Sequence, residues 1–377
     1  MSSVGAAAAS ALFGPEGSIS VSRGIAEFRS LRPVILVGPD ESLLALPAEG
    51  LDTRRLGEFI ALCAPTTPHL VVTARRARVL GVDAATPTAL ELSRGIDAQA
   101  ILALAADAKG VDVPEARRAG GAAAAALRLA KLAHVLPAVL AAGVASAGPG
   151  AHEPPLVRVD AVAVDRFVDD ATRSLTLASE ASVPLNSGTR TRFVVFRDAL
   201  GGNPVAIIVG KPDFAQPVPV RLHSACLTGD VFGSRRCDCG DQLRLAVARL
   251  EGMGGGIILY LAQEGRDLGL ANKMRAYQLQ DEGLDTVDAN TTLGFDDDER
   301  DYGVAARMLQ MLGCTRIVLL TNNPAKLEAL ARAGIEVVSR VPLVTPINAD
   351  NLRYMTAKAA RAGHRLDSIM ASLADPS

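Results

Sequence analysis

The chain has 377 residues, of which 49% are hydrophobic and only 3% are aromatic, and it contains no tryptophan. Its net charge of −2 gives no electrostatic reason to expect nucleic acid or an anionic membrane as a partner. This length predicts two domains of ordinary size, and five cysteines, three of them clustered, argue against a disulfide framework.

The first residues, MSSVGAAAASALFG, lack the basic region and the long apolar region of a secretory signal. Together with the unpaired cysteines, this predicts a cytoplasmic protein. The most apolar stretch, residues 121–147, is interrupted by charged residues and by Pro137. We therefore expect a buried helix there and no membrane span.

The N-terminal part alternates between strand-like and helix-like patterns over residues 15–145. Apolar runs at 33–37 and 69–73 predict strands, whereas residues 54–63 and the Ala-rich residues 121–135 have helical spacing. The following stretch, SAGPGAHEPPL, is rich in proline and glycine, as linkers are. We expect a first domain over 1–145, a linker over 146–170 and a second domain over 171–377.

Beyond residue 188 the pattern changes. Strands joined by Gly/Pro turns are predicted at 192–196, 205–209 and 218–223, which suggests an antiparallel sheet. The later periodicity predicts helices at 241–251, 270–281, 299–312 and 324–333, and strands at 256–261, 316–320 and 335–338. The fold class expected is a two-domain α/β (α+β) protein in which the second domain has a mixed sheet.

Three cysteines fall within fourteen residues, namely Cys226, Cys237 and Cys239. Thiolates bind Zn²⁺ well, and three protein ligands leave the fourth tetrahedral position for water or substrate. A structural zinc site would normally close with a fourth Cys or His, but the nearest imidazole is His223 and the other cysteines are distant in sequence. The spacing favours a catalytic zinc. The alternative is three reduced thiols that pack as small hydrophobic groups.

Two further motifs follow predicted strands. In residues 263–266 (QEGR), Arg266 suits a phosphate and Glu264 suits a base edge or a water, although a solvated charged loop is an equal alternative. Residues 321–326 (TNNPAK) open a helix, whose free N–H groups and Lys326 suit an anion. There the equal alternative is that Asn323 simply caps the helix.

Two other features have plainer explanations from the sequence alone. The acidic run at residues 296–301 lies at a predicted helix start, where compensation of the helix dipole is sufficient reason for it. Tyr277 shares an apolar stripe with Leu270 and Met274 on the helix predicted at 270–281, and such a residue is more often core than catalytic.

Taken together, the motifs resemble GTP cyclohydrolase II. The matching runs are RLHSACLTGD, RRCDCGDQL, LYLAQEGRDLGL, DTVDAN, LGFDDDERDYG and LLTNNPAKLEAL, within residues 188–364. The resemblance implies zinc-dependent hydrolysis of GTP to 2,5-diamino-6-ribosylamino-4(3H)-pyrimidinone 5′-phosphate, formate and diphosphate, the first step of riboflavin biosynthesis. It also implies Mg²⁺ bound with the substrate phosphates, and a homodimer.

Residue by residue, the resemblance implies that Cys226, Cys237 and Cys239 hold one zinc per chain. It implies catalytic roles for Asp298, Arg300 and Tyr277. Family members assign a nucleophile to the position of Arg300, but a guanidinium stays protonated, so an electrostatic role on the phosphate is physically easier. The positions that match GTP contacts are Arg221, Leu222, His223, Ser224, Ala225, Gln242, Glu264, Gly265, Arg266, Thr286, Thr321 and Lys326.

The N-terminal half resembles a 3,4-dihydroxy-2-butanone 4-phosphate synthase domain through RPVILVG and RAGGAAAAALRLAKLA. The acidic loop of that enzyme is reduced here to Asp40 and Glu41, so we expect a degenerate, catalytically inactive relative. In the second half, many relatives carry Glu where this chain has Ala225.

Three alternatives to a GTP cyclohydrolase II with one active domain stay open. A paralogue could act on another nucleotide or pyrimidine, which Ala225 motivates. A non-catalytic nucleotide sensor is the second alternative, although a pure binder has no need of an open zinc site. An enzyme with both activities is the least supported by the residues.

Overall fold

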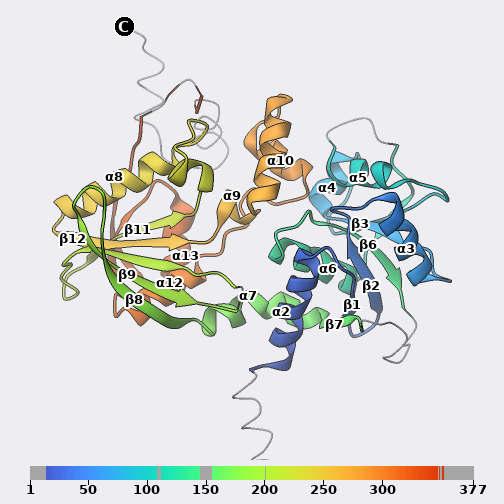
Figure 1. The fold of residues 1–377 in the computed structure, drawn as a ribbon, viewed down its shortest axis with the longest axis horizontal. Coiled ribbons are helices and arrows are strands. Elements are labelled where there is room, and N and C mark those ends of the chain that lie inside the picture. Colours follow the sequence, from blue (N-terminus) through green and yellow to red (C-terminus); the bar gives the residue numbers. More distant parts are fainter. Residues whose placement is uncertain are drawn as a thin grey trace, which may run out of the picture. The chain divides into compact units, whose positions relative to one another are not determined.

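The computed structural model describes residues 14–107, 112–144, 155–199, 201–346, 348 and 350–351. The chain divides into two compact units, and both combine helices with a mixed sheet, which confirms the predicted fold class (Figure 1). The first unit contains Met1–Asp170, Ala271–Leu284 and Asp288–Asp298, and the second contains Ala171–Leu270, Asp285–Val287 and Glu299–Ser377. The predicted linker residues 146–154 and the last residues of the predicted resemblance, 352–364, lie outside the described residues.

The first unit is built on a seven-stranded sheet with the order β5-β4-β3-β6-β2-β1-β7. Neighbouring strands are antiparallel except β1 and β7, which are parallel. The strands are β1 (Val34–Val37), β2 (Ser42–Pro47), β3 (His69–Val72), β4 (Thr88–Glu91), β5 (Ala116–Arg118), β6 (Ala138–Gly143) and β7 (Val157–Asp160).

The helices of the first unit lie on the two faces of this sheet, with α2 and α6 together on one face and α3 on the other (Figure 1). They are α2 (Glu16–Arg29), α3 (Thr53–Cys63), α4 (Ala74–Val79), α5 (Ala98–Ala106) and α6 (Gly121–Leu132). The apolar stretch 121–147 is therefore not one buried helix. His134 adopts a left-handed φ of 58° after α6, and the chain then returns as the central strand β6.

Part of the predicted linker is regular structure. Residues 157–160 form β7 at the edge of the first sheet, and helix α7 (Ala161–Arg173) follows directly. Val159, Val164 and Phe167 are buried, because alternation in the strand and helical spacing in α7 place these apolar side chains on the inner face. Residues 157–170 are thus not a linker in the structure.

The second unit contains a seven-stranded sheet with the order β14-β13-β11-β12-β10-β9-β8. Its strands are β8 (Thr176–Pro184), β9 (Arg190–Arg197), β10 (Val205–Gly210), β11 (Val218–Ser224), β12 (Gly255–Leu261), β13 (Arg316–Leu320) and β14 (Glu336–Val341). The expected antiparallel sheet is correct for β9 and β10 but wrong for β11, which pairs in parallel with β12 and β13.

Helices cover both faces of the second sheet, with α8 on one face and α12 and α13 on the other (Figure 1). Strand β12 shows why: Ile257 and Leu259 pack with the α12 and α13 side, whereas Ile258 packs with α8. The helical elements after β11 are η1 (Leu227–Val231), α8 (Cys239–Gly252), α9 (Glu264–Asp267), α10 (Leu270–Asp281), α11 (Thr286–Thr292), α12 (Gly303–Met311) and α13 (Pro324–Arg332). None of the helices in the described ranges has the length and apolarity needed to cross a membrane.

Helix α10 has the predicted bounds, but the predicted apolar stripe is not its buried face. Leu270 and Met274 are both 40% exposed. The buried residues are Asn272, Lys273, Ala276 and Leu279. Asn272 donates to the carbonyl of His134 at 3.0 Å, and Lys273 lies 5.6 Å from the ring centre of Tyr277, contacts that helical periodicity does not reveal.

Helix α6 begins without a capping side chain of its own, because Gly120 occupies the N-cap. Glu41, from the loop between β1 and β2, supplies the missing acceptor and receives a hydrogen bond from the backbone N–H of Ala122 at 3.0 Å. A Cβ on Gly120 would lie 2.1 Å from a carboxylate oxygen of Glu41. The carboxylate of Glu41 therefore packs directly against Gly120 and caps this helix start.

We predict that Glu41→Ala destabilises the first unit by about 1 kcal/mol, the typical value of a helix cap. Glu41→Gln keeps an acceptor and loses only the attraction between charge and helix dipole, so its loss should be smaller. Amide hydrogen exchange in α6, measured for both variants and the unchanged protein, provides the test. Equal protection of α6 in all three proteins would contradict the cap.

Candidate metal centre and active site

The predicted site residues of the second unit gather at one edge of its sheet. Strands β11, β12 and β13 are parallel, so their carboxyl ends meet at the same edge. Residues 221–226 lie at the end of β11, 263–266 follow β12, and 321–326 follow β13. Ligands of open α/β sheets bind outside the carboxyl ends of the strands, and this edge is therefore the candidate site.

The three clustered cysteines come together at this edge. Cys226 precedes η1, Cys239 begins α8, and their ligand atoms and that of Cys237 all lie within 4.8 Å of one another. The sulfur atoms of Cys226 and Cys237 are 3.7 Å apart. Two thiolates bound to one tetrahedral Zn²⁺ at about 2.3 Å would be separated by about 3.8 Å. The donor set and its spacing thus fit zinc.

Gly229 closes the other side of the cysteine cluster. A Cβ at this position would lie 2.9 Å from the sulfur of Cys237 and 3.1 Å from that of Cys226. Real Cβ atoms essentially never approach other heavy atoms below about 3.0 Å, because packed atoms repel at that range. A glycine is therefore needed for the η1 backbone to approach the sulfurs of Cys226 and Cys237 so closely.

The cluster without a cation is poorly suited to carrying several negative charges. The hydrogen bond with Cys226 is the main cause that raises the pKa of the Cys237 thiol, and burial adds to it, while Cys239 acts in the opposite direction. Thiols that crowd one another lose their protons together only when a metal ion neutralises the charge. This is the behaviour expected of ligands and is not that of a lone reactive cysteine.

Asp230 links the backbone of the cysteine cluster to the side chains around it. The sequence motifs did not point to this residue. Its carboxylate accepts hydrogen bonds from the backbone N–H of Cys226 and from the hydroxyl of Tyr260, both at 3.0 Å, and contacts Nε2 of His223 at 3.1 Å. Its own N–H donates to the carbonyl of Cys226. The spacing of four residues from Cys226 was visible in the sequence, but its hydrogen-bond partners were not.

His223 lies in the same network and is buried, with 2% of its side chain exposed. Burial lowers the pKa of His223, although the hydrogen bond that it donates to Asp230 raises it, so the imidazole is neutral at pH 7. Its ring stacks on Tyr260 with centroids 5.6 Å apart. Within the described residues its Nδ1 is buried without a partner, as is typical of a site that binds a polar ligand.

Arg221 and Gln242 form a second buried polar group. The guanidinium of Arg221 donates to the side-chain oxygen of Gln242 at 2.5 Å and to the carbonyl of Leu320 at 3.1 Å. Gln242 in turn donates to Asp238, which lies between two of the cysteines in sequence and is fully buried. Burial lowers the pKa of Arg221 to about 10, so it keeps its positive charge at pH 7.

The residues after β13 also face this edge. Asn323 caps α13 by accepting from the N–H of Ala325 at 2.9 Å, while the anion site at this helix start stays a prediction. Lys326 is buried and donates to the carbonyl of Leu222 at 2.8 Å. Its Nζ lies 5.6 Å from the ring centre of Tyr302, and Arg300 lies 5.7 Å from the same ring. Both cations therefore lie near the ring of the same buried tyrosine. The sequence pattern gave no sign of this role for Tyr302.

The loop after β12 is strained and contacts the cysteine turn. Glu264 accepts from the N–H of Leu227, next to Cys226, at 2.6 Å. Gly265 and Arg266 both have φ near 63°, a left-handed conformation that is costly for Arg266. The carbonyl of Arg266 accepts from the N–H of Glu299, which fixes the backbone immediately before Arg300.

The remaining predicted residues are distributed as follows. Ser224 donates to Gln263, the backbone N–H of Ala225 donates to Leu261, and Thr321 accepts from the N–H of Asn323. Tyr277 and Asp298 belong to the first compact unit, and Thr286 begins α11 in the second. Their catalytic and binding roles stay predictions.

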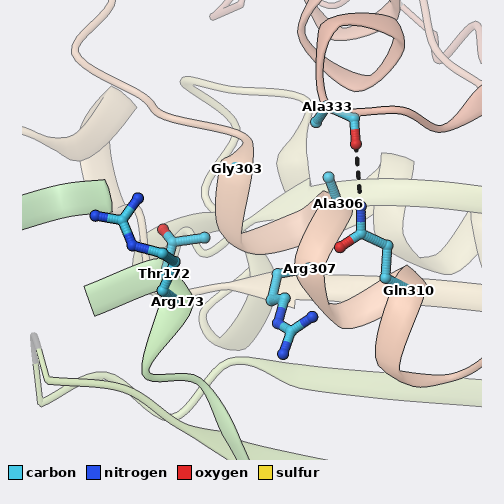
Figure 2. Close-up of a pocket in the computed structure, with 7 residues that line it drawn as sticks. All are labelled: Thr172, Arg173, Gly303, Ala306, Arg307, Gln310 and Ala333. Atoms are coloured by element: carbon cyan, nitrogen blue, oxygen red, sulfur yellow. Dashed lines mark hydrogen bonds between the residues drawn. The ribbon is translucent and has the colours of Figure 1, made fainter. Parts of the chain in front are cut away.

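A pocket of about 510 Å³ lies at another place in the second unit, between α7, α12 and α13 (Figure 2). Arg173, Arg307 and Gln310 contribute to its lining, and Gln310 donates to the carbonyl of Ala333 at 3.0 Å. None of the cysteines and none of the predicted site residues lines it. The pocket is therefore separate from the candidate metal centre.

Comparisons with known proteins give relatives of this chain. The family model of GTP cyclohydrolase II matches residues 176–342. GTP cyclohydrolase-2 of Azospirillum brasilense is 42% identical over 92% of this chain and 93% of its own length. GTP cyclohydrolase-2 of Xylella fastidiosa is 39% identical over 94% and 89%, respectively. Riboflavin biosynthesis protein RibBA of Bacillus mycoides is 53% identical over 43% of this chain and 41% of its own length.

Among solved structures, a two domain 3,4-dihydroxy-2-butanone 4-phosphate synthase from A. baumannii covers 86% of this chain and 99% of its own. The two share 17% identity at a TM-score of 0.32, which is too low to support an argument about fold or function.

We predict that Gly229→Ala lowers zinc affinity by at least about 10-fold, because the added methyl group displaces the sulfurs of Cys226 and Cys237. Zinc per chain, measured by elemental analysis after dialysis against graded chelator, gives the affinity. Gly252→Ala is the matched control, since a Cβ there meets nothing within 4 Å. Unchanged zinc retention by Gly229→Ala would rule out this packing role.

Proposed function

Because the chain belongs to the GTP cyclohydrolase II family, we propose that it hydrolyses GTP to 2,5-diamino-6-ribosylamino-4(3H)-pyrimidinone 5′-phosphate, formate and diphosphate, as the first step of riboflavin biosynthesis. The observation that carries the proposal is the convergence of Cys226, Cys237 and Cys239 at the edge where the loops after β12 and β13 also end. Identity to the relatives extends over nearly the whole chain, which supports the same reaction.

We propose one Zn²⁺ per chain, held by Cys226, Cys237 and Cys239. When bound, such a zinc supplies a water of lowered pKa for attack on the guanine ring. The chain's own contribution is to hold the three sulfurs: Asp230 fixes the backbone at Cys226, Gly229 allows the close approach, and Asp238 anchors the stretch between the other two cysteines.

The cations of the same edge suit the triphosphate. Arg221 and Lys326 are both buried and hydrogen-bonded to backbone or amide oxygens, so they are held in place before any ligand arrives. The start of α13 adds the positive end of the helix dipole. Arg266 and Arg300 extend this positive region, and Mg²⁺ is expected to accompany the phosphates.

For Arg300 we propose electrostatic stabilisation of the α-phosphate. A guanidinium stays protonated, so it is a weak nucleophile and a strong hydrogen-bond donor. Its position against the ring of Tyr302, which Lys326 also contacts, fits a role in orienting charge. Asp298 is proposed as the proton acceptor and Tyr277 as a donor or orienting group, both from the family resemblance.

The guanine ring is proposed to be oriented by groups from β11 and from the loop after β12. His223 is neutral and its Nε2 donates to Asp230, so Nδ1, which has no partner in the described residues, can accept a hydrogen bond from the substrate. Ser224, Gln242 and Glu264 lie on the same edge. Leu222 and Thr321 would line the site through backbone and hydroxyl groups.

Ala225 supports one second candidate, a paralogue that acts on another nucleotide or pyrimidine. The side chain precedes Cys226, and a relative's carboxylate at this position would add an acceptor beside the metal centre. Its backbone N–H donates to Leu261, so the main chain is held regardless of the side chain. The substitution therefore changes the chemistry beside the zinc without changing the fold.

For the first unit we propose no synthase activity. Of its two remaining acidic loop residues, Glu41 is bound to the start of α6, which leaves it poorly placed for a metal ion. Homodimer formation and a cytoplasmic location are proposed on the family resemblance and on the five free cysteines.

We predict stoichiometric release of formate and diphosphate from GTP by the purified protein with Mg²⁺. Cys237→Ser should lower kcat by at least about 100-fold, because even partners of a metal ligand affect activity by 10- to 100-fold. Cys63→Ala, at a buried cysteine of the first unit, is the control and should retain both zinc and activity. Coupled enzyme assays for formate and for diphosphate provide the measurement.

Zinc retention with no formate from GTP would refute the proposed reaction and favour the paralogue. In that case Ala225→Glu would show whether the missing carboxylate is the cause. GTP binding without any product in either protein would instead identify a nucleotide sensor.

A further inference from the structure

A segment of the cyclohydrolase region is built into the first unit. Residues 271–284 and 288–298, here called the shared segment, fall within the family match at 176–342. The compact first unit nevertheless includes them together with the N-terminal half of the chain. The shared segment contains Tyr277 and Asp298, and Arg300 follows two residues later in the chain. The contacts that hold the shared segment to the N-terminal half of the chain therefore matter for the proposed reaction.

Arg76, on α4, makes the most deeply buried attachment, with 1% of the residue exposed. Its guanidinium donates to the carbonyls of Leu104 and Ala103 at the end of α5, at 2.7 and 2.8 Å. It also donates to the carbonyl of Thr292, the last residue of α11, at 3.0 Å. A cation at two helix C-termini bonds their terminal carbonyls and opposes both helix dipoles. Burial lowers the pKa of Arg76 to about 10, so it keeps its charge at pH 7.

Thr73 fixes the next point of the shared segment. Its hydroxyl donates to the carbonyl of Gly294 at 2.7 Å and accepts from the N–H of Arg76 at 3.2 Å. Gly294 has a φ of 87°, and a Cβ there would lie 3.0 Å from the Thr73 hydroxyl and 3.3 Å from Pro137. The glycine therefore lies directly against the first unit in a conformation that other residues rarely adopt.

Asp296 is attached two residues further on, by ion pairs with Arg75 at 3.0 Å and Lys131 at 3.2 Å. These pairs are partly exposed and individually weak. Their value is positional, because they come from α4 and α6 and reach the residue immediately before Asp297 and Asp298. The attachment thus continues to within two residues of the proposed proton acceptor.

Helix α10, in the earlier part of the shared segment, is attached by polar contacts as well. Asn272 donates to the carbonyl of His134 at 3.0 Å. Arg275 pairs with Glu49 at 3.1 Å, and Glu49 also accepts from the N–H of Leu136 at 2.8 Å. Directional hydrogen bonds fix the register of a segment more narrowly than apolar packing, in which side chains can shift.

We infer that the first unit, although degenerate as a synthase, serves as a platform that positions the shared segment for the cyclohydrolase, with Thr73 and Arg76 as positioning residues. The inference rests on the proposed function. Thr73 and Arg76 hold the backbone that leads into Asp298 and Arg300. Neither residue contacts GTP itself.

The test compares Thr73→Val with Thr73→Ser in the full-length protein. The valine has nearly the same shape but loses both hydrogen bonds, whereas the serine keeps the hydroxyl. Asp52→Ala is the matched control, since Asp52 caps α3 by accepting from Arg55 at 2.7 Å and makes no hydrogen bond or ion pair with the shared segment in the described residues. Zinc per chain, melting temperature, and kcat and KM for formate release from GTP are measured for all three variants.

Thr73→Val is expected to lower kcat by about 10-fold at unchanged zinc content, since a displacement of catalytic groups by about 1 Å has effects of this order or larger. Thr73→Ser should restore most of kcat. Amide hydrogen exchange over residues 288–298 should be faster in the valine variant than in the serine variant. Asp52→Ala should lower the melting temperature by a similar amount and leave kcat and the exchange of residues 288–298 unchanged.

A surface pair of variants removes the possibility that buried changes simply impair folding. Arg75→Gln combined with Lys131→Gln removes the partners of Asp296 and should lower kcat in the same direction, by about 3-fold, in keeping with two partly exposed ion pairs. Arg117→Gln is the control, because it removes an exposed ion pair with Glu91 that lies outside the shared segment.

Two results would overturn the inference separately from the proposed function. If the unchanged protein releases formate but Thr73→Val matches Asp52→Ala in kcat and exchange, Thr73 has only a structural role and the platform is refuted. If the unchanged protein releases no formate from GTP, the proposed function fails first, and the inference falls with it.

Discussion

The parallel pairing of β11 with β12 and β13 is the constraint on which the candidate site depends. Each strand enters the sheet in the same direction, so the chain leaves all three at one edge. Three short motifs that are far apart in sequence thereby become neighbours, and each brings a different chemistry: sulfur ligands, a strained carboxylate and arginine loop, and a helix start with a buried lysine. The apolar residues of β12, fully buried on both faces, hold this arrangement rigidly.

Buried polar networks then give the edge its shape. Asp230 connects the backbone of Cys226 to His223 and Tyr260, while Asp238 connects the stretch between Cys237 and Cys239 to Gln242 and, through it, to Arg221. Each carboxylate contacts the cysteine segments through the backbone or a neighbouring side chain. In a region of low dielectric such bonds are strong when complete and costly when broken. The two aspartates are therefore as important to the site's geometry as the cysteines are to its chemistry.

In the first unit, charged side chains stabilise the ends of helices. Glu41 caps α6, and Arg76 donates to the carbonyl ends of two helices. The hydrogen bonds of both side chains go to backbone groups. Because one of the two helices that Arg76 joins belongs to the cyclohydrolase region, the fold of the first unit and the conformation of the shared segment are physically connected.

The sequence by itself determined the cysteine cluster, the family and the bounds of several elements. Helix α10 and strand β13 begin and end where the periodicity placed them, because local spacing of apolar residues reports which face is buried or which segment is extended. The tertiary structure alone decided that β11 pairs with β12 and β13, that Asp230 and Tyr302 join the site, and that α10 buries Asn272 and Lys273 instead of its apolar stripe. The physical reason is that strand partners and buried hydrogen bonds depend on contacts between residues far apart in the chain, for which local pattern carries no signal.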